Sequence, residues 1–65
     1  MENLRQINDI SYTPIKGDTV YLNNRYGCLL DDEFSQIIWS DNEEVESWIG
    51  GFLEFLNQGG LILVI

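Results

Sequence analysis

The chain has 65 residues, of which 11 are acidic and three are basic, so its formal net charge is −8 at pH 7. A surface of this charge repels nucleic acid and anionic membranes and attracts basic partners. One cysteine and no histidine exclude an internal disulfide and leave too few ligands for a zinc site.

The length permits a single domain, and we expect residues 1–65 to form one small α+β domain. Residues 1–14 carry apolar side chains at Leu4, Ile7 and Ile10 ahead of Pro14, a spacing that suits an irregular or helical N-terminal arm. The arm lacks an apolar run of signal-peptide length, and no run in the chain approaches the roughly 20 residues of a membrane span. We therefore expect a soluble, cytoplasmic protein without membrane contact.

Three short segments predict an antiparallel meander. Residues 16–18 form a turn that leads into a strand at residues 19–22, in which Val20 and Leu22 share one face. Residues 23–27 predict a hairpin loop, because asparagine tolerates positive φ and Gly27 adopts it freely. A second strand follows at residues 28–30 and ends at three acidic residues. The β-branched and aromatic residues 34–39 then predict the third strand.

The clearest pattern is an amphipathic helix that starts at Ser40 or Asp41. Either residue can cap the helix N-terminus, and Glu43 or Glu44 completes a capping box. Apolar residues then recur at helical spacing until residues 57–60, which end the helix. The apolar stripe consists of Val45, Trp48, Ile49, Phe52 and Leu56, with Leu53 and Phe55 on its flanks. The opposite face carries Glu43, Ser47 and Glu54, with Glu46 at its edge.

Two adjacent glycines, Gly50 and Gly51, interrupt this helical pattern. Each glycine costs roughly 0.8–1 kcal/mol relative to alanine inside a helix. Both lie away from the apolar stripe, so core packing does not explain them. Two interpretations stay open, namely close contact with a partner and a kink or break in the helix.

Residues 61–65 are wholly apolar and predict a C-terminal strand that is buried on both faces. If this strand lies beside the third strand, the helix makes a right-handed crossover between parallel neighbours. The element order is then β-β-β-α-β, in the α+β class. One helix covers only one face of the sheet, so the N-terminal arm, a second copy of the chain or the functional partner would cover the other.

The candidate binding residues follow from the distribution of charge. After Arg25 the chain carries eight acidic residues and no basic residue, whereas ordinary surfaces mix both signs. On the predicted helix, Glu43 and Glu54 would be about 16 Å apart, roughly two phosphate intervals, so the acids could imitate a nucleic-acid backbone. The alternative is a solvated face that keeps a small protein soluble. The candidate partner-binding residues are Asp31, Asp32, Glu33, Asp41, Glu43, Glu44, Glu46 and Glu54, with Trp39 and Phe55 as apolar anchors.

Catalytic and metal sites have little support in the sequence. The chain has no histidine that could act as a base for Cys28, and it has no glycine-rich phosphate loop. We therefore expect neither enzymatic activity nor a cofactor. Neither residues 31–33 nor residues 41–44 have the ligand spacing of a calcium loop, so we expect no specific metal site.

The six residues 16–21, with the sequence KGDTVY, are similar to the opening strand of small SH3-like barrels such as the KOW module of ribosomal and elongation proteins. The resemblance implies a strand at this position. Those modules tend to be basic whereas this chain is acidic, so we do not carry over a nucleic-acid-binding function.

Together these features predict a small acidic, non-enzymatic binding protein. It would inhibit or regulate a larger basic macromolecule by occlusion, as a phage or mobile-element inhibitor of a nucleic-acid enzyme or defence complex, or as an immunity protein or antitoxin. Nucleic-acid mimicry belongs to this first hypothesis. The alternative is a self-assembling structural or accessory subunit, in which an apolar sheet face forms a homodimer or a higher oligomer. Neither hypothesis involves direct contact with nucleic acid.

Overall fold

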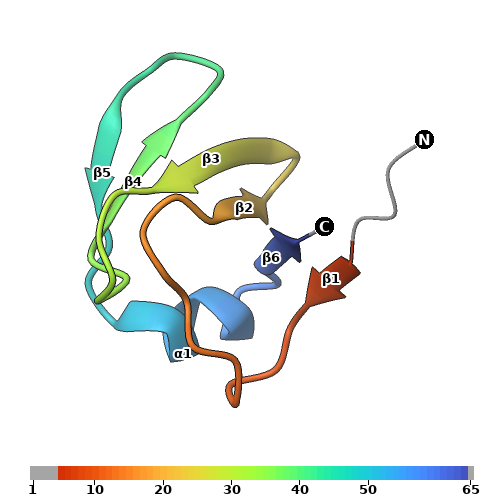
Figure 1. Cartoon of the computed structure of the whole chain (residues 1–65). Helices are drawn as coiled ribbons and strands as arrows, with labels where there is room; N and C mark the ends of the chain where they lie inside the picture. The colour runs from red at the N-terminus through yellow and green to blue at the C-terminus, as the bar shows by residue number, and fades with distance from the viewer. Residues whose placement is uncertain (1–4, 65) are drawn as a thin grey trace.

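The computed structural model describes residues 5–64, which form one antiparallel sheet with a short helix packed against one of its faces (Figure 1). The strand order is β1-β6-β2-β3-β4-β5. The predicted α+β class is confirmed, whereas the predicted meander has too few strands. Predictions for residues 1–4 and for Ile65 lie outside the described residues. The elements are β1 (Arg5–Ile7), β2 (Thr19–Leu22), β3 (Arg25–Leu29), β4 (Gln36–Trp39), β5 (Val45–Ser47), α1 (Gly51–Asn57) and β6 (Leu61–Val64).

The hairpin of β2 and β3 follows the sequence pattern closely. The predicted strand at residues 19–22 is confirmed as β2. It joins β3 through Asn23 and Asn24, whose φ angles of 55° and 64° fit a two-residue hairpin turn with two left-handed positions. The predicted loop of residues 23–27 is too long, because residues 25–27 already belong to β3.

Gly27 lies in β3 where the backbone passes closest to β4. A Cβ atom at this position would lie 2.8 Å from Ile37 Cγ2 and 3.0 Å from both the Ile38 carbonyl oxygen and Trp39 Cε3. Glycine is therefore required for this approach. The predicted third strand begins too early, because Phe34 adopts φ 56° in the turn before β4 and buries its ring in the core.

The predicted helix is wrong in its first half. Residues 45–47 form β5, which pairs antiparallel with β4, and α1 begins only at Gly51. Gly50 and Gly51 have φ angles of 103° and 69°, left-handed values that no continuous helix contains, so the break interpretation is confirmed. The tertiary reason is that a helix over residues 41–49 would leave one edge of β4 without backbone partners, and β5 supplies them.

The predicted helix start is replaced by a hairpin turn. No capping box forms at Ser40 or Asp41, because both residues precede a strand. Glu43 lies in the turn with φ 58°, and its backbone N–H donates to the Trp39 carbonyl oxygen at 2.7 Å.

Strand β6 lies between β1 and β2 and runs antiparallel to both. The predicted parallel pairing with the third strand is wrong, because β3 and β5 occupy both edges of β4. Burial on both faces is also wrong, since only Ile62 is fully buried and the rest of β6 is half-buried. Pairing with β6 makes residues 5–7 a strand, which corrects the expectation of an irregular or helical arm at these positions.

The core lies between α1 and the sheet face that α1 covers, which we call the inner face. Ile7 and Tyr12 pack against this core, so the N-terminal segment contributes to the inner side of the sheet. The Tyr12 hydroxyl donates to the Asp18 carboxylate at 2.8 Å, and this bond is the main cause that raises the pKa of Tyr12. The buried core residues are Val20, Leu22, Leu29, Phe34, Ile37, Trp39, Phe52, Phe55 and Ile62.

Candidate functional site

The candidate acids lie in three separate places. The continuous ridge predicted from Glu43 to Glu54 does not exist, because α1 begins at Gly51. The loop between β3 and β4 carries Asp31, Asp32 and Glu33, the β4–β5 hairpin carries Asp41, Glu43, Glu44 and Glu46, and α1 carries Glu54.

The first two acids of the β3–β4 loop shape the loop itself. Asp31 accepts hydrogen bonds from the backbone N–H groups of Glu33 and Ser35 and from the Ser35 hydroxyl. The Ser35 hydroxyl is the main cause that holds the pKa of Asp31 below its ordinary value. Asp32 accepts the Lys16 backbone N–H at 2.6 Å and thereby ties this loop to the turn before β2. Asp31 and Asp32 therefore have local structural partners, as aspartates in turns commonly do.

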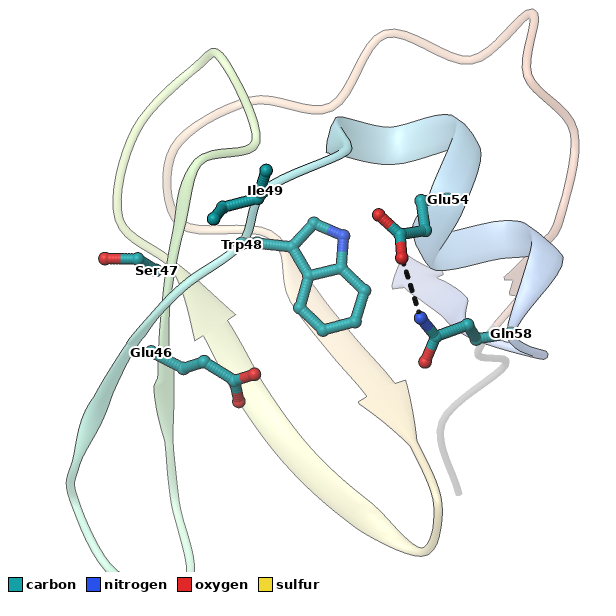
Figure 2. A pocket seen from close by; sticks show the side chains of 6 residues that line it. All are labelled: Glu46, Ser47, Trp48, Ile49, Glu54 and Gln58. Carbon is teal, nitrogen blue, oxygen red and sulfur yellow. Dashed lines mark hydrogen bonds between the residues drawn. The ribbon is translucent and has the colours of Figure 1, made fainter.

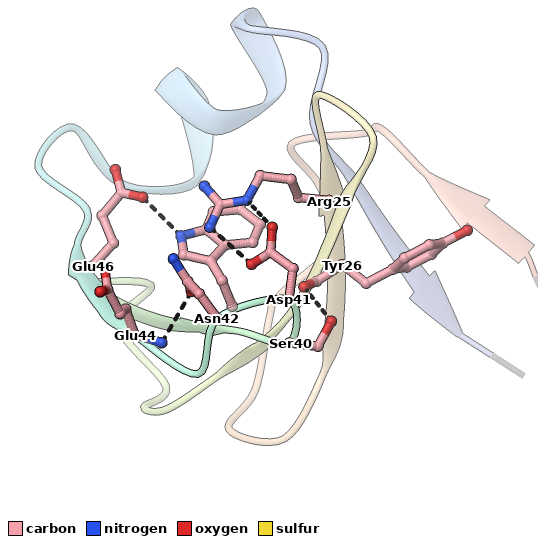
Figure 3. Close-up of polar contacts among 8 residues, drawn as sticks. Arg25, Tyr26, Ser40, Asp41, Asn42, Glu44 and Glu46 are labelled. Carbon is pink, nitrogen blue, oxygen red and sulfur yellow. Dashed lines mark hydrogen bonds and ion pairs between the residues drawn. The ribbon is translucent and has the colours of Figure 1, made fainter.

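Arg25 on β3 connects the hairpin acids to the core. Its guanidinium donates to the Asp41 carboxylate from Nε at 2.8 Å and from Nη2 at 3.0 Å (Figure 3). The same guanidinium lies over the Trp39 ring, with its central carbon 4.5 Å from the ring centroid. Trp39 donates its indole N–H to Glu46 at 2.7 Å. The bond to Asp41 is the main cause that raises the pKa of Arg25, and the charge of Glu46 raises it further.

Glu43 and Glu44 lie in the turn of the β4–β5 hairpin, and both are exposed. Asn42 shapes this turn, because its side-chain oxygen accepts the Glu44 backbone N–H at 3.1 Å (Figure 3). Within residues 5–64, neither of these two carboxylates has a hydrogen bond or an ion pair. Their charges are therefore open to a cation from another molecule.

An open cleft of about 280 Å³ lies between β5 and α1, and we call it the Trp48 cleft. Figure 2 shows the Trp48 indole between the carboxylates of Glu46, from β5, and Glu54, from α1. The cleft thus combines an aromatic surface with two negative charges and no positive charge. Its lining residues are Glu46, Ser47, Trp48, Ile49, Glu54 and Gln58.

Trp48 is held in place by contacts on three sides. Its indole N–H donates to the Gly51 carbonyl oxygen at 2.9 Å, and its ring meets the buried Phe55 ring edge-on at a centroid distance of 5.3 Å. Its backbone N–H donates to the Ser35 carbonyl oxygen at 2.7 Å. The side chain is only half-buried, so part of the fixed ring faces the cleft. The neighbouring Ile49 is 85% exposed.

Sequence reasoning missed this cleft, because it placed Trp48 and Ile49 on the buried stripe of a longer helix. The signal that could have revealed it is the pair Gly50 and Gly51, which separates these two side chains from α1. Because α1 begins only at Gly51, Trp48 and Ile49 precede the helix and do not follow its apolar stripe into the core.

The two predicted apolar anchors lie in the core instead of at the surface. Trp39 is 3% exposed and lies beneath Arg25, and Phe55 is 0% exposed. Phe55 packs against Phe34 at 5.0 Å between ring centroids, and its ring lies against Gly60, where a Cβ atom would collide with it. Neither ring offers a partner any surface, so the exposed apolar residue at the cleft is Ile49.

The outer face of the sheet, opposite α1, is largely apolar and carries no charged side chain on the described part of its strands, but Glu43 of the β4–β5 turn lines a hollow in it. The rings of Tyr21 and Tyr26 lie 4.8 Å apart on this face, and Tyr26 and Val45 are each 53% exposed. A shallow hollow of about 390 Å³ crosses it at Cys28 and Ile38. The strand register places there Gln6, Thr19, Tyr21, Tyr26, Cys28, Gln36, Ile38, Val45, Ser47, Leu61 and Leu63, all of them exposed or half-buried.

Among residues 5–64, no three side chains of the metal-binding types are grouped closely enough to hold an ion. This part of the chain also has no helix with the length and apolar character needed to cross a membrane. Comparison with protein families, with curated proteins and with solved structures found no match to the chain. The function must therefore be inferred from the surface of the protein itself, chiefly from the Trp48 cleft and the outer face.

Proposed function

We propose that this protein is a small acidic binding protein that occupies the surface of a larger basic protein and thereby blocks or regulates it. The observation that carries the proposal is the Trp48 cleft, in which exposed Ile49 and half-buried Trp48 lie between two carboxylates. A surface that joins an apolar anchor to an excess of charge of one sign is suited to a partner of the opposite charge.

The two components of this surface have different roles in binding. The net charge of −8 attracts a basic partner over a distance of about 10 Å at 0.1 M salt and speeds its association. Ile49 and the open part of Trp48 lose contact with water in the complex, which slows dissociation. Because Trp48 is already fixed by its bonds to neighbouring residues, little side-chain entropy is lost there.

The structure changes the form of this hypothesis in one respect. Imitation of a phosphate backbone depended on a regular row of acids along one helix, and Glu43 and Glu54 lie on different elements. The proposal therefore rests on charge and apolar contact at one cleft, without nucleic-acid mimicry. A basic toxin, nuclease or defence protein remains the class of target that this chemistry suits.

The test compares a variant in which charges are reversed at the cleft with a variant in which charges are reversed elsewhere on the surface. The double variant Glu46→Lys and Glu54→Lys reverses the two exposed acids that line the cleft, and the control Asp9→Lys and Glu33→Lys changes two exposed acids outside its lining. Both doubles change the net charge by the same amount. The probe is an arginine- and lysine-rich peptide of about 20 residues, whose association is followed by stopped-flow fluorescence.

We expect the cleft-side double to slow association at least tenfold at low salt and the control double to slow it about threefold or less, because the local field dominates at short range. We also expect wild-type association to slow as salt rises. Equal effects of the two doubles would contradict a localised site. Failure of the wild-type protein to bind any basic probe would contradict the proposed function as a whole.

A second candidate function, self-assembly, is favoured by the outer face. In a chain of net charge −8, the strands of this face carry no charged side chain within residues 5–64 and Glu43 is the one charged residue in the lining of its hollow, so two copies can meet there with little direct charge repulsion. Molar mass from light scattering at low and high salt tests it. A dimer that persists in high salt, and that Tyr26→Lys or Val45→Lys converts to a monomer, would support assembly. A monomer at both salt concentrations would exclude it.

A further inference from the structure

We propose that the Trp48 cleft receives a single arginine side chain of the basic partner, stacked on the indole between Glu46 and Glu54. This inference rests on the proposed function and names the chemical group that the cleft recognises. It is carried by the lining of the cleft and by a similar arrangement that the chain itself already contains.

The lining of the cleft favours a flat cation. The Trp48 ring is fixed and partly open, and an aromatic face attracts a cation within about 6 Å of its centroid. Each flanking carboxylate uses one oxygen within the protein, since Glu46 Oε1 accepts from Trp39 and Glu54 Oε2 accepts from Gln58 at 3.1 Å. Within residues 5–64 the second oxygen of each carboxylate has no hydrogen-bond donor, although Glu54 Oε1 lies against Gly50. The cleft volume of about 280 Å³ is several times the roughly 30 Å³ share of one water molecule.

The adjoining cluster of Arg25, Trp39 and Asp41 shows the same chemistry with its cation in place. There the Arg25 guanidinium lies 4.5 Å from the centroid of the Trp39 ring and donates two hydrogen bonds to Asp41. Glu46 touches both this cluster and the Trp48 cleft, because it accepts the Trp39 indole N–H and also lines the cleft. The Trp48 cleft has an aromatic ring and two carboxylates but no guanidinium in its own lining, while Arg25 lines the adjoining hollow of about 190 Å³ together with Glu46 and Trp48.

Arginine fits this cleft better than lysine or a metal ion. A guanidinium presents several N–H donors in one plane and stacks on aromatic rings, so it can contact an indole and two carboxylates together. Lysine offers a compact charge that is more strongly hydrated and stacks less well. Calcium needs six to eight oxygen ligands, and the cleft supplies only two carboxylates beside an apolar ring.

The test uses the short peptide Ac-Gly-Arg-Gly-amide and two analogues in which citrulline or lysine replaces arginine. Citrulline keeps the shape and most of the hydrogen-bonding capacity of arginine but has no charge. Binding is followed by NMR through the indole N–H signals of the two tryptophans. Because the Trp39 indole N–H donates to Glu46, its signal reports on the Glu46 side of the cleft, whereas the Trp48 signal reports on the ring itself.

We expect saturable, millimolar binding of the arginine peptide that shifts the Trp48 signal, severalfold weaker binding of the lysine peptide, and no saturable shift with citrulline. Glu46→Gln and Glu54→Gln should each weaken arginine binding about three- to tenfold, because each removes a charge while an amide oxygen can still accept the internal hydrogen bond. Glu33→Gln, which makes the same charge change in the β3–β4 loop, should leave the affinity unchanged.

Two results would overturn the inference. Equal shifts with arginine and citrulline would mean that the cleft does not recognise a cation. Equal weakening by Glu33→Gln and Glu54→Gln would mean that the whole acidic surface attracts arginine, which rejects the cleft as the site but leaves the proposed function intact. The proposed function itself fails in the separate experiment, if the longer basic peptide does not bind the wild-type protein.

Discussion

Strands β3 and β5 flank the same strand, β4, yet β3 contributes two buried residues and β5 contributes none. Hydrogen bonding to a central strand therefore does not bury a side chain. Burial depends on what covers the inner face: Leu29 of β3 belongs to the core cluster with Phe34 and Phe55, whereas no residue of β5 does. Strand β5 turns Glu46 to that side, and an inward charge on an edge strand also discourages pairing with further strands.

Within one small sheet, the part that stabilises the fold is separate from the part that is open to a partner. The region of β2, β3, β4 and the buried side of α1 holds the core. The region from the β4–β5 hairpin to Ile49 presents charge and apolar surface to the solvent. Substitutions in the first region should reduce stability, whereas substitutions in the second should change binding and leave the fold intact. Single substitutions in each region can test this separation, beginning with those that should cost the most stability.

The largest effect is expected at Phe55. Phe55→Ala should reduce the free energy of unfolding by about 3–5 kcal/mol, because it leaves a cavity beneath the sheet. Since a domain of this size has a total stability of roughly 3–10 kcal/mol, this variant can lose its fold entirely. The milder Phe55→Leu then gives a measurable midpoint in urea. Leu53→Ala, on the exposed side of α1 at 56% exposure, is the control and should change stability by less than about 1 kcal/mol.

At Gly27 the expected effect is smaller. Gly27→Ala should cost about 1–3 kcal/mol, because the new Cβ atom would lie 2.8 Å from Ile37 Cγ2 and force β3 away from β4. Urea unfolding measures the loss, with the exposed Gln36→Ala on β4 as the control. A neutral result for Gly27→Ala would show that the contact between β3 and β4 yields without cost.

Gly50 lies at the junction of the two regions. Gly50→Ala should destabilise the protein by roughly 1–2 kcal/mol, because φ of 103° strains any residue that carries a Cβ atom. Gln58→Ala, at the other end of α1 with φ −88°, is the control. If Gly50→Ala were instead stabilising, the segment from β5 to α1 would adopt a different backbone from the one described.

Asp31 provides a pH-dependent test within the β3–β4 loop. The pKa of Asp31 is lowered from its ordinary value of 3.8, chiefly by the Ser35 hydroxyl. Its charged form therefore stabilises the fold above the ordinary pKa, and this contribution is lost as pH falls through the lower pKa of the folded state. Wild type should be more stable than Asp31→Asn at pH 7, and the difference should shrink below about pH 4. A difference that does not change with pH would show that the carboxylate charge is not involved.

The smallest effect on stability is expected at Ile49. Ile49→Ser should change the free energy of unfolding by no more than about 0.5 kcal/mol, because the side chain is 85% exposed. The same variant should weaken binding to the basic peptide of the charge-reversal experiment. Leu53→Ser, on α1 at 56% exposure and outside the cleft lining, should leave binding unchanged. Strong destabilisation by Ile49→Ser would place Ile49 in the core and remove the proposed anchor.

Part of the candidate site was predictable from the sequence. The excess of acids after Arg25, and with it the attraction for basic partners, is a property of composition alone. Which acids gather at one place was not predictable, because Asp31 and Asp32 serve their loop while Glu46 and Glu54 meet across two elements. The burial of Trp39 and Phe55 was not predictable either, because tertiary packing decides which side chains α1 and the sheet cover.

The sequence by itself determined the elements whose signals are local. The alternating residues of β2, the asparagine pair at 23–24, the apolar run of β6 and the second half of the helix follow from conformational preference and spacing within a few residues. Which strands pair along their free edges depends on contacts between residues far apart in the chain. Residues 45–47 became a strand because β4 had unpaired backbone groups, and β6 joined β2 because both edges of β4 were already taken. The Trp48 cleft exists because of that choice, since pairing of β5 with β4 brings Glu46 opposite α1.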